Sequence, residues 1–114
     1  MRFIRPKNSD KIFWTKHALE KMRFYNLSEN RLKRVLRNPS RKEEGIAPET
    51  LAVMQRAGSK KHPTEIWLMY QIIKSKVKNQ KLKVISAWRY PGISPKDKEI
   101  PIPQDILEEL NKII

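Results

Sequence analysis

The chain has 114 residues, of which 25 are Lys or Arg and 12 are Asp or Glu, so its formal net charge is +13. It contains no cysteine, which excludes disulfide bonds and cysteine-ligated zinc or iron–sulfur centres. No stretch approaches the roughly 20 apolar residues of a membrane span, and no signal-peptide core opens the chain. We therefore expect one soluble, cytoplasmic domain over residues 1–114 that uses no metal, no other cofactor and no membrane.

Two short helices are predicted in the first half of the chain. The first begins at Thr15, whose side chain can cap it, and ends near Asn26, which tolerates the left-handed backbone of a helix C-terminus. The second begins from Ser28 and is stopped by Pro39. Each has one apolar stripe: Ala18, Leu19, Met22 and Tyr25 in the first, and Leu32, Val35 and Leu36 in the second. We expect these helices to form a hairpin.

The second half of the chain is predicted to form strands. The predicted strands are residues 50–57, 64–74 and 81–90, and the last two are rich in β-branched and aromatic residues. The last two of these segments are joined by the polar residues 75–80, which predicts an antiparallel hairpin. Both are apolar on two faces near their middles, so we expect helices to cover one face of the sheet and part of the other.

The chain closes with an irregular segment and a third helix. Residues 91–103 contain four prolines, which predicts a strap without regular structure. Residues 104–114 carry apolar residues at helical spacing and predict a short amphipathic helix. Helices and strands are thus grouped rather than alternating, and the predicted class is α+β.

The basic residues are concentrated at the start of the chain. Thirteen of them lie between Arg2 and Lys42, against three acidic residues in the same span. Such an excess repels itself and is typical of a surface that binds a polyanion, most often nucleic acid. The predicted nucleic-acid contacts are Lys16, Arg23, Arg31, Lys33, Arg34, Arg37, Lys42 and, as a base platform, Trp88. Two alternatives stay open: a solvated helix face for the cations, and a core position for the tryptophan.

His17 is the first candidate for chemistry. It lies in the first turn of the first helix, where the positive end of the helix dipole disfavours the imidazolium ion. Lys16 and Lys21 act in the same direction, so the ring tends towards the neutral form that a general base needs. Lys21 shares a face with His17 and could hold the same phosphate. The alternative is a surface or half-buried histidine without a role.

Arg89 and Tyr90 are the second candidates. Arg89 lies at the end of the predicted strand 81–90, where its guanidinium could clamp a phosphate through two hydrogen bonds. The alternative is an edge arginine that stacks on an aromatic neighbour. Tyr90 could donate a proton or stack on a base, and it could equally be a buried ring with a satisfied hydroxyl.

Three segments resemble a known family. HALEKM (His17–Met22), KRVLRNP (Lys33–Pro39) and VISAWRY (Val84–Tyr90) are similar to a small bacterial domain family of uncharacterised function with a His-Ala-x-x-Arg-Met helix. That family is grouped with the RelE and BrnT ribonuclease toxins. The resemblance covers most of residues 13–90. It departs from the family pattern at Lys21, where arginine is commoner, and at residues 25–26, where the family often has Arg-Gly.

The resemblance implies a fold and an activity. The fold is an N-terminal two-helix hairpin packed on a curved, three- to four-stranded antiparallel sheet, with a short C-terminal helix. The activity is metal-independent RNA cleavage, in which the 2′-hydroxyl attacks its own phosphate. His17 then corresponds to the family's histidine, Lys21 to its arginine and Arg89 to its strand arginine. The implied partners are RNA, including ribosome-bound mRNA, and a cognate antitoxin protein.

Two functions are therefore expected, with a weaker third. In a toxin-type endoribonuclease, His17 is the general base, Lys21 and Arg89 stabilise the charge on the phosphorane, and Tyr90 or Tyr70 protonates the leaving oxygen. This requires His17 and Arg89 to meet in one positively charged hollow. The alternative is a non-catalytic RNA- or DNA-binding module, in contact with ribosomes. A peripheral membrane protein is the third, and the lack of a strongly apolar basic helix argues against it.

Overall fold

The structure is a computed structural model that describes residues 3–9, 11–74 and 80–113. Its elements are β1 (Ile12–Trp14), α1 (Lys16–Phe24), α2 (Glu29–Arg37), β2 (Arg41–Glu44), β3 (Thr50–Gly58), β4 (Pro63–Lys74), β5 (Gln80–Pro91) and α3 (Gln104–Ile113). The five strands form one mixed sheet in the order β1-β5-β4-β3-β2. The predicted α+β class is confirmed.

The sheet differs from the expected one in its size and in one strand direction. β3, β4 and β5 lie within one residue of their predicted bounds and pair antiparallel. β1 and β2 were not predicted, and β1 runs parallel to β5, with Ile12 opposite Leu82. The expectation of three or four antiparallel strands is therefore wrong. The predicted turn at residues 75–80 falls almost entirely outside the described residues.

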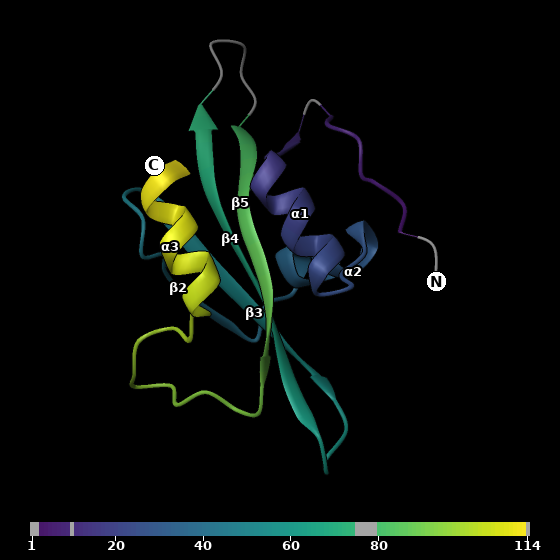
Figure 1. Cartoon of the computed structure of the whole chain (residues 1–114), viewed down its shortest axis with the longest axis vertical. Coiled ribbons are helices and arrows are strands. Elements are labelled where there is room, and N and C mark those ends of the chain that lie inside the picture. Colours follow the sequence, from purple (N-terminus) through teal and green to yellow (C-terminus); the bar gives the residue numbers. More distant parts are fainter. Residues whose placement is uncertain (1–2, 10, 75–79, 114) are drawn as a thin grey trace.

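The two predicted helix caps are present. Thr15 Oγ1 accepts a hydrogen bond from the Ala18 amide at 3.0 Å, and Ser28 Oγ accepts one from the Arg31 amide at 3.1 Å. Each satisfies one of the free amides at a helix start. Asn26 adopts a left-handed backbone with φ of 56°, as expected for the residue after α1. This turn returns the chain, so α1 and α2 lie on the same side of the sheet (Figure 1).

Helices cover both faces of the sheet (Figure 1). One core lies under α1 and α2 and includes Trp14, Ala18, Met22, Leu32, Val35, Val53, Ile66, Leu68, Val84 and Ala87. The other lies under α3 and includes Ala52, Met54, Trp67, Met69, Ile85, Trp88, Ile106 and Leu110. Trp67 and Trp88 stack with ring centroids 6.0 Å apart. Trp88 is 0% exposed, so the prediction that it binds nucleic acid is wrong and the core alternative holds.

The strap between β5 and α3 is fixed by a buried carboxylate. Glu65 is 0% exposed and accepts hydrogen bonds from Ser94, through its amide at 3.0 Å and its hydroxyl at 2.6 Å, and from Trp67 Nε1 at 3.1 Å. Arg41 Nη1 donates to Ser94 Oγ at 3.0 Å, and its Nη2 donates to the Lys98 carbonyl at 3.0 Å. These bonds hold the segment that leads into α3, and so they help to set where α3 packs.

Candidate functional site

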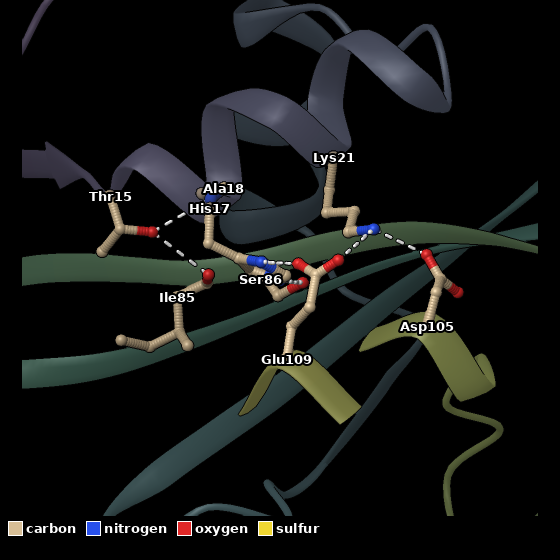
Figure 2. A network of polar contacts seen from close by, with 8 residues as sticks. All are labelled: Thr15, His17, Ala18, Lys21, Ile85, Ser86, Asp105 and Glu109. Atoms are coloured by element: carbon tan, nitrogen blue, oxygen red, sulfur yellow. Dashed lines mark hydrogen bonds and ion pairs between the residues drawn. The ribbon is translucent and has the colours of Figure 1, made fainter. Parts of the chain in front are cut away.

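His17 is held between α1, β5 and α3 (Figure 2). The hydroxyl of Thr15, the cap of α1, donates to the Ile85 carbonyl at 3.1 Å, which fixes the start of the helix against β5. The His17 side chain is only 6% exposed. Its Nε2 lies 2.9 Å from Ser86 Oγ, and its Nδ1 lies 2.6 Å from Glu109 Oε2. The imidazole is therefore a bridge inside the molecule rather than a group on its surface.

Lys21 lies one turn after His17 and is held by two acidic residues of α3 (Figure 2). Its Nζ lies 2.6 Å from Asp105 Oδ2 and 3.2 Å from Glu109 Oε1. Burial alone would lower the pKa of Lys21, but its hydrogen bonds to the two carboxylates raise it above the ordinary value. The ammonium is therefore charged and already neutralised, so it offers little attraction to a phosphate.

The order of groups around His17 is that of a serine hydrolase triad: Ser86, His17, Glu109. Burial lowers the pKa of His17 more than the nearby Glu109 carboxylate raises it, so the ring is neutral at pH 7. Nε2 then accepts a hydrogen bond from the Ser86 hydroxyl, and Nδ1–H faces Glu109 off its hydrogen-bonding axis. Because Ser86 is 0% exposed, no substrate reaches its oxygen. The three side chains are arranged as in a triad, but a substrate cannot reach the serine. The network instead connects α1, β5 and α3.

His17 and Arg89 do not share a site. Residues directly opposite each other in neighbouring strands point to the same face of a sheet. Ser86, which contacts His17, is opposite Met69 in the core under α3. Arg89 is opposite Ile66 in the core under α1 and α2. The predicted convergence of the imidazole and this guanidinium is therefore wrong, because β5 separates them.

Tyr90 does not complete a site with Arg89 either. The two residues are neighbours in β5, so their side chains point to opposite faces. Tyr90 is half-buried and packs against the core under α3. The four residues predicted to act together in catalysis are thus divided: His17, Lys21 and Tyr90 on the side of α3, and Arg89 on the side of α2.

Arg89 instead lines a groove with two other arginines. The groove has a volume of about 760 Å³ and lies between the α1–α2 turn, the first turns of α2 and the end of β5. Arg31 and Arg34 from α2 line it together with Arg89, and we call it the arginine groove. Arg31 Nη1 donates to Gln55 Oε1 at 2.6 Å, and Arg89 Nη2 donates weakly to the Tyr25 carbonyl at 3.4 Å. Among the residues that the structure describes, the partners of these two guanidiniums are neutral oxygens.

The arginine groove carries an excess of positive charge. Burial and then the charges of Arg34 and Arg89 lower the pKa of Arg31 below its ordinary value, so these two guanidiniums repel that of Arg31. Within the described part of the chain, none of the three takes part in an ion pair. Glu29, which also lines the groove, pairs with Lys33 at 2.8 Å. An anion bound among the arginines would relieve this repulsion.

The other predicted nucleic-acid contacts are distributed over α1, α2 and β2. Lys16, Arg23, Arg37 and Lys42 are exposed, and Lys33 is half-buried in its pair with Glu29. Lys42 is opposite Val53 in the core under α1 and α2, so it points to the side of the sheet that α2 covers. These residues can extend a basic surface away from the groove, whereas Lys33 contributes less because it is already paired.

The residues that the sequence did not indicate are Ser86, Asp105 and Glu109. The available signal was a match of spacing: His17 and Lys21 are four residues apart on α1, and Asp105 and Glu109 are four apart on α3. Residues at that spacing share one helix face, so the two pairs can meet if the helices do. The local sequence does not indicate that α1 and α3 contact each other across the edge of β5.

Comparison of the chain with protein-family models, with curated proteins and with solved structures gives no match. In the described part of the chain, no three His, Asp or Glu side chains are grouped as metal ligands would be. No helix in that part is long and apolar enough to cross a bilayer. The function must therefore be inferred from the residues themselves.

Proposed function

We propose that the chain is a nucleic-acid-binding module that holds phosphates in the arginine groove. The observation that carries this proposal is the convergence of Arg31, Arg34 and Arg89 on one groove, where none of them pairs with a carboxylate of the described residues. Guanidinium groups suit phosphate because they donate two parallel hydrogen bonds. The net charge of +13 adds a long-range attraction to any polyanion.

A toxin-type ribonuclease, which the sequence resemblance implies, is the competing proposal. The geometry favours it less, because His17 faces Ser86 and Glu109 and lies across β5 from Arg89. For an RNA phosphate to reach His17, α3 would have to leave, which would expose the buried side chains of Ile106 and Leu110. RNA fragments that end in 2′,3′-cyclic phosphate, formed in EDTA by the wild type and not by His17→Ala, would favour the nuclease.

Salt dependence tests the binding proposal. Titration of a fluorescent 12-mer of oligouridine at 50–300 mM salt should give a log–log slope of about −2 to −4, for about three to six neutralised phosphates. The double variant Arg31→Gln/Arg34→Gln should bind more weakly and lose about 0.7 of slope per lost contact. An affinity independent of salt would contradict the proposal.

A matched control removes the same charge elsewhere. Lys96 and Lys98 are exposed in the strap between β5 and α3, and Arg41 contacts these two residues through their backbone carbonyls, not their side chains. Lys96→Gln/Lys98→Gln therefore lowers the net charge by two without touching the arginine groove. If the control weakens binding as much as the groove variant does, the groove has no special role and net charge alone explains the affinity.

A further inference from the structure

Apolar side chains line the arginine groove beside the three guanidiniums. Leu27 and Ile66 are each 1% exposed, so they close the bottom of the groove. Phe3 also lines it, is half-buried and packs against the core under α1 and α2. The groove thus combines three cations with an aromatic ring and an apolar floor. A surface that binds only phosphates does not need the ring or the floor.

The ligand that offers both features is an unpaired nucleotide. In a duplex the faces of the bases are stacked inside, and only phosphates, sugars and base edges are presented. In a single strand each nucleotide presents a phosphate and a free base face, and aromatic side chains stack on that face. We infer that the arginine groove binds one unpaired nucleotide of a single strand, with its phosphate at the guanidiniums and its base on Phe3.

The size of the groove suits this ligand. Its volume of about 760 Å³ falls in the range of about 300–1,000 Å³ of sites that enclose small organic ligands. Ala57 lines it too, and its small side chain leaves room beside Ile66 and Phe3 for a planar base. This inference rests on the proposed function and adds to it that the bound strand is unpaired.

The first experiment compares the two forms of one sequence. The 12-mer of oligouridine is titrated alone and annealed to oligoadenosine, at several salt concentrations. Because stacking of one base on an aromatic side chain changes affinity by about 5- to 150-fold, the single strand should bind tighter than the duplex by a factor in that range. Equal affinities would overturn the inference.

The second experiment removes the ring while keeping an apolar side chain. Phe3→Leu should weaken binding of the single strand by about 5- to 150-fold, and it should leave the salt slope unchanged because no phosphate contact is lost. Phe13 is the control: it is 37% exposed on β1 and does not line the groove. Phe13→Leu should bind like the wild type. Thermal unfolding of both variants verifies that each is folded.

The outcomes separate this inference from the proposed function. If the wild type binds both forms equally with a steep salt slope, the base contact is absent while the phosphate contacts stand. If Phe3→Leu weakens the single strand and the duplex by the same factor, the base contact is again refuted. If neither form binds with a salt dependence, the proposed function fails and this inference fails with it.

Discussion

The imidazole of His17 lies with its Nδ1 2.6 Å from Oε2 of Glu109, and this contact joins the first helix of the chain to the last. The same carboxylate lies 3.2 Å from Lys21 Nζ through its other oxygen. Ser86 on β5 completes the network at 2.9 Å from Nε2. A histidine that the sequence marks for catalysis thus acts as a link between two helices that lie on different sides of the sheet.

The first prediction concerns the stability that this link provides. His17→Ala should lower the free energy of unfolding by about 1–3 kcal/mol, because it leaves the buried Ser86 hydroxyl without its partner. Urea unfolding followed by circular dichroism measures the change. Affinity for oligouridine should stay unchanged, since His17 does not line the arginine groove.

Glu108 provides the control for that link. It is exposed on α3, next to Glu109, so Glu108→Gln changes one charge without reaching the network. Glu108→Gln should unfold at nearly the wild-type urea concentration, whereas Glu109→Gln should be destabilised through its contacts with His17 and Lys21. If His17→Ala abolished RNA binding with the fold intact, the structural role assigned to His17 would be wrong.

The second prediction is a dependence of stability on pH. Burial lowers the pKa of His17 below its ordinary value of 6.5, against the opposing effect of Glu109 and with a smaller lowering by Lys21. Below pH 6.5 the unfolded chain therefore binds a proton at this position that the folded chain does not bind. Stability should be full above pH 6.5 and should fall as the pH drops from there towards the folded-state pKa.

The measurement is urea unfolding of the wild type and of His17→Gln between pH 7.5 and 5.5. The variant should lack the part of the pH dependence that comes from position 17, and it retains His62, the other histidine of the chain. An NMR titration of the His17 ring should give a pKa below 6.5. A wild-type stability that rises on acidification would show that Glu109 outweighs burial and that folding raises the pKa of His17 instead of lowering it.

The long strands and the helix caps could be predicted because their signals are local. β4 and β5 are rich in β-branched and aromatic residues, and Thr15 and Ser28 occupy capping positions directly before apolar stripes. β1 spans three residues, too few to show alternation. β2 has the sequence RKEE, whose four charges give no strand signal, and it forms because β3 offers it an edge.

The sequence could predict which arginines take part in the candidate site, but not which side chains come together in space. The basic excess of the first half led to Arg31 and Arg34, and the end of the predicted strand 81–90 led to Arg89; the structure brings these three together. The pairing of His17 with Arg89 failed because it depends on which face each side chain takes. Ser86, the β5 contact of His17, and Arg89 are three residues apart in a regularly paired part of β5, so they point to opposite faces. His17 reaches the face of Ser86 because of where α1 packs, and that packing has no signature in the local sequence.

The third prediction concerns the buried carboxylate of Glu65. The carboxylate is the acceptor in all three of these hydrogen bonds, whose donors are the Ser94 amide, the Ser94 hydroxyl and Trp67 Nε1. Glu65→Gln places an amide group against one of these donors, so the free energy of unfolding should fall by about 1–3 kcal/mol. The Ser94 amide should also exchange its hydrogen faster than in the wild type. Glu99→Gln, at an exposed position in the same strap, should change neither quantity.

The fourth prediction follows from the repulsion inside the arginine groove. Arg34 and Arg37 are both exposed and both lie in the last turn of α2, where each interacts similarly with the helix dipole. Only Arg34 lines the groove and adds to the positive potential at Arg31. At low salt, Arg34→Gln should therefore be more stable than Arg37→Gln by about 0.2–0.5 kcal/mol, the usual size of a like-charge effect on a helix.

Two conditions should remove that difference. Near 1 M salt the screening length falls to about 3 Å, so the two variants should unfold together. Oligouridine should stabilise the wild type and Arg37→Gln more than Arg34→Gln, because a ligand that binds only the folded state adds its binding free energy to the stability. In an anion site, the repulsion among the arginines lowers the stability of the free chain. Binding of the anion then raises the stability again. If Arg34→Gln were the less stable variant at low salt, Arg34 would not be repelling Arg31, and the groove would not be such a site.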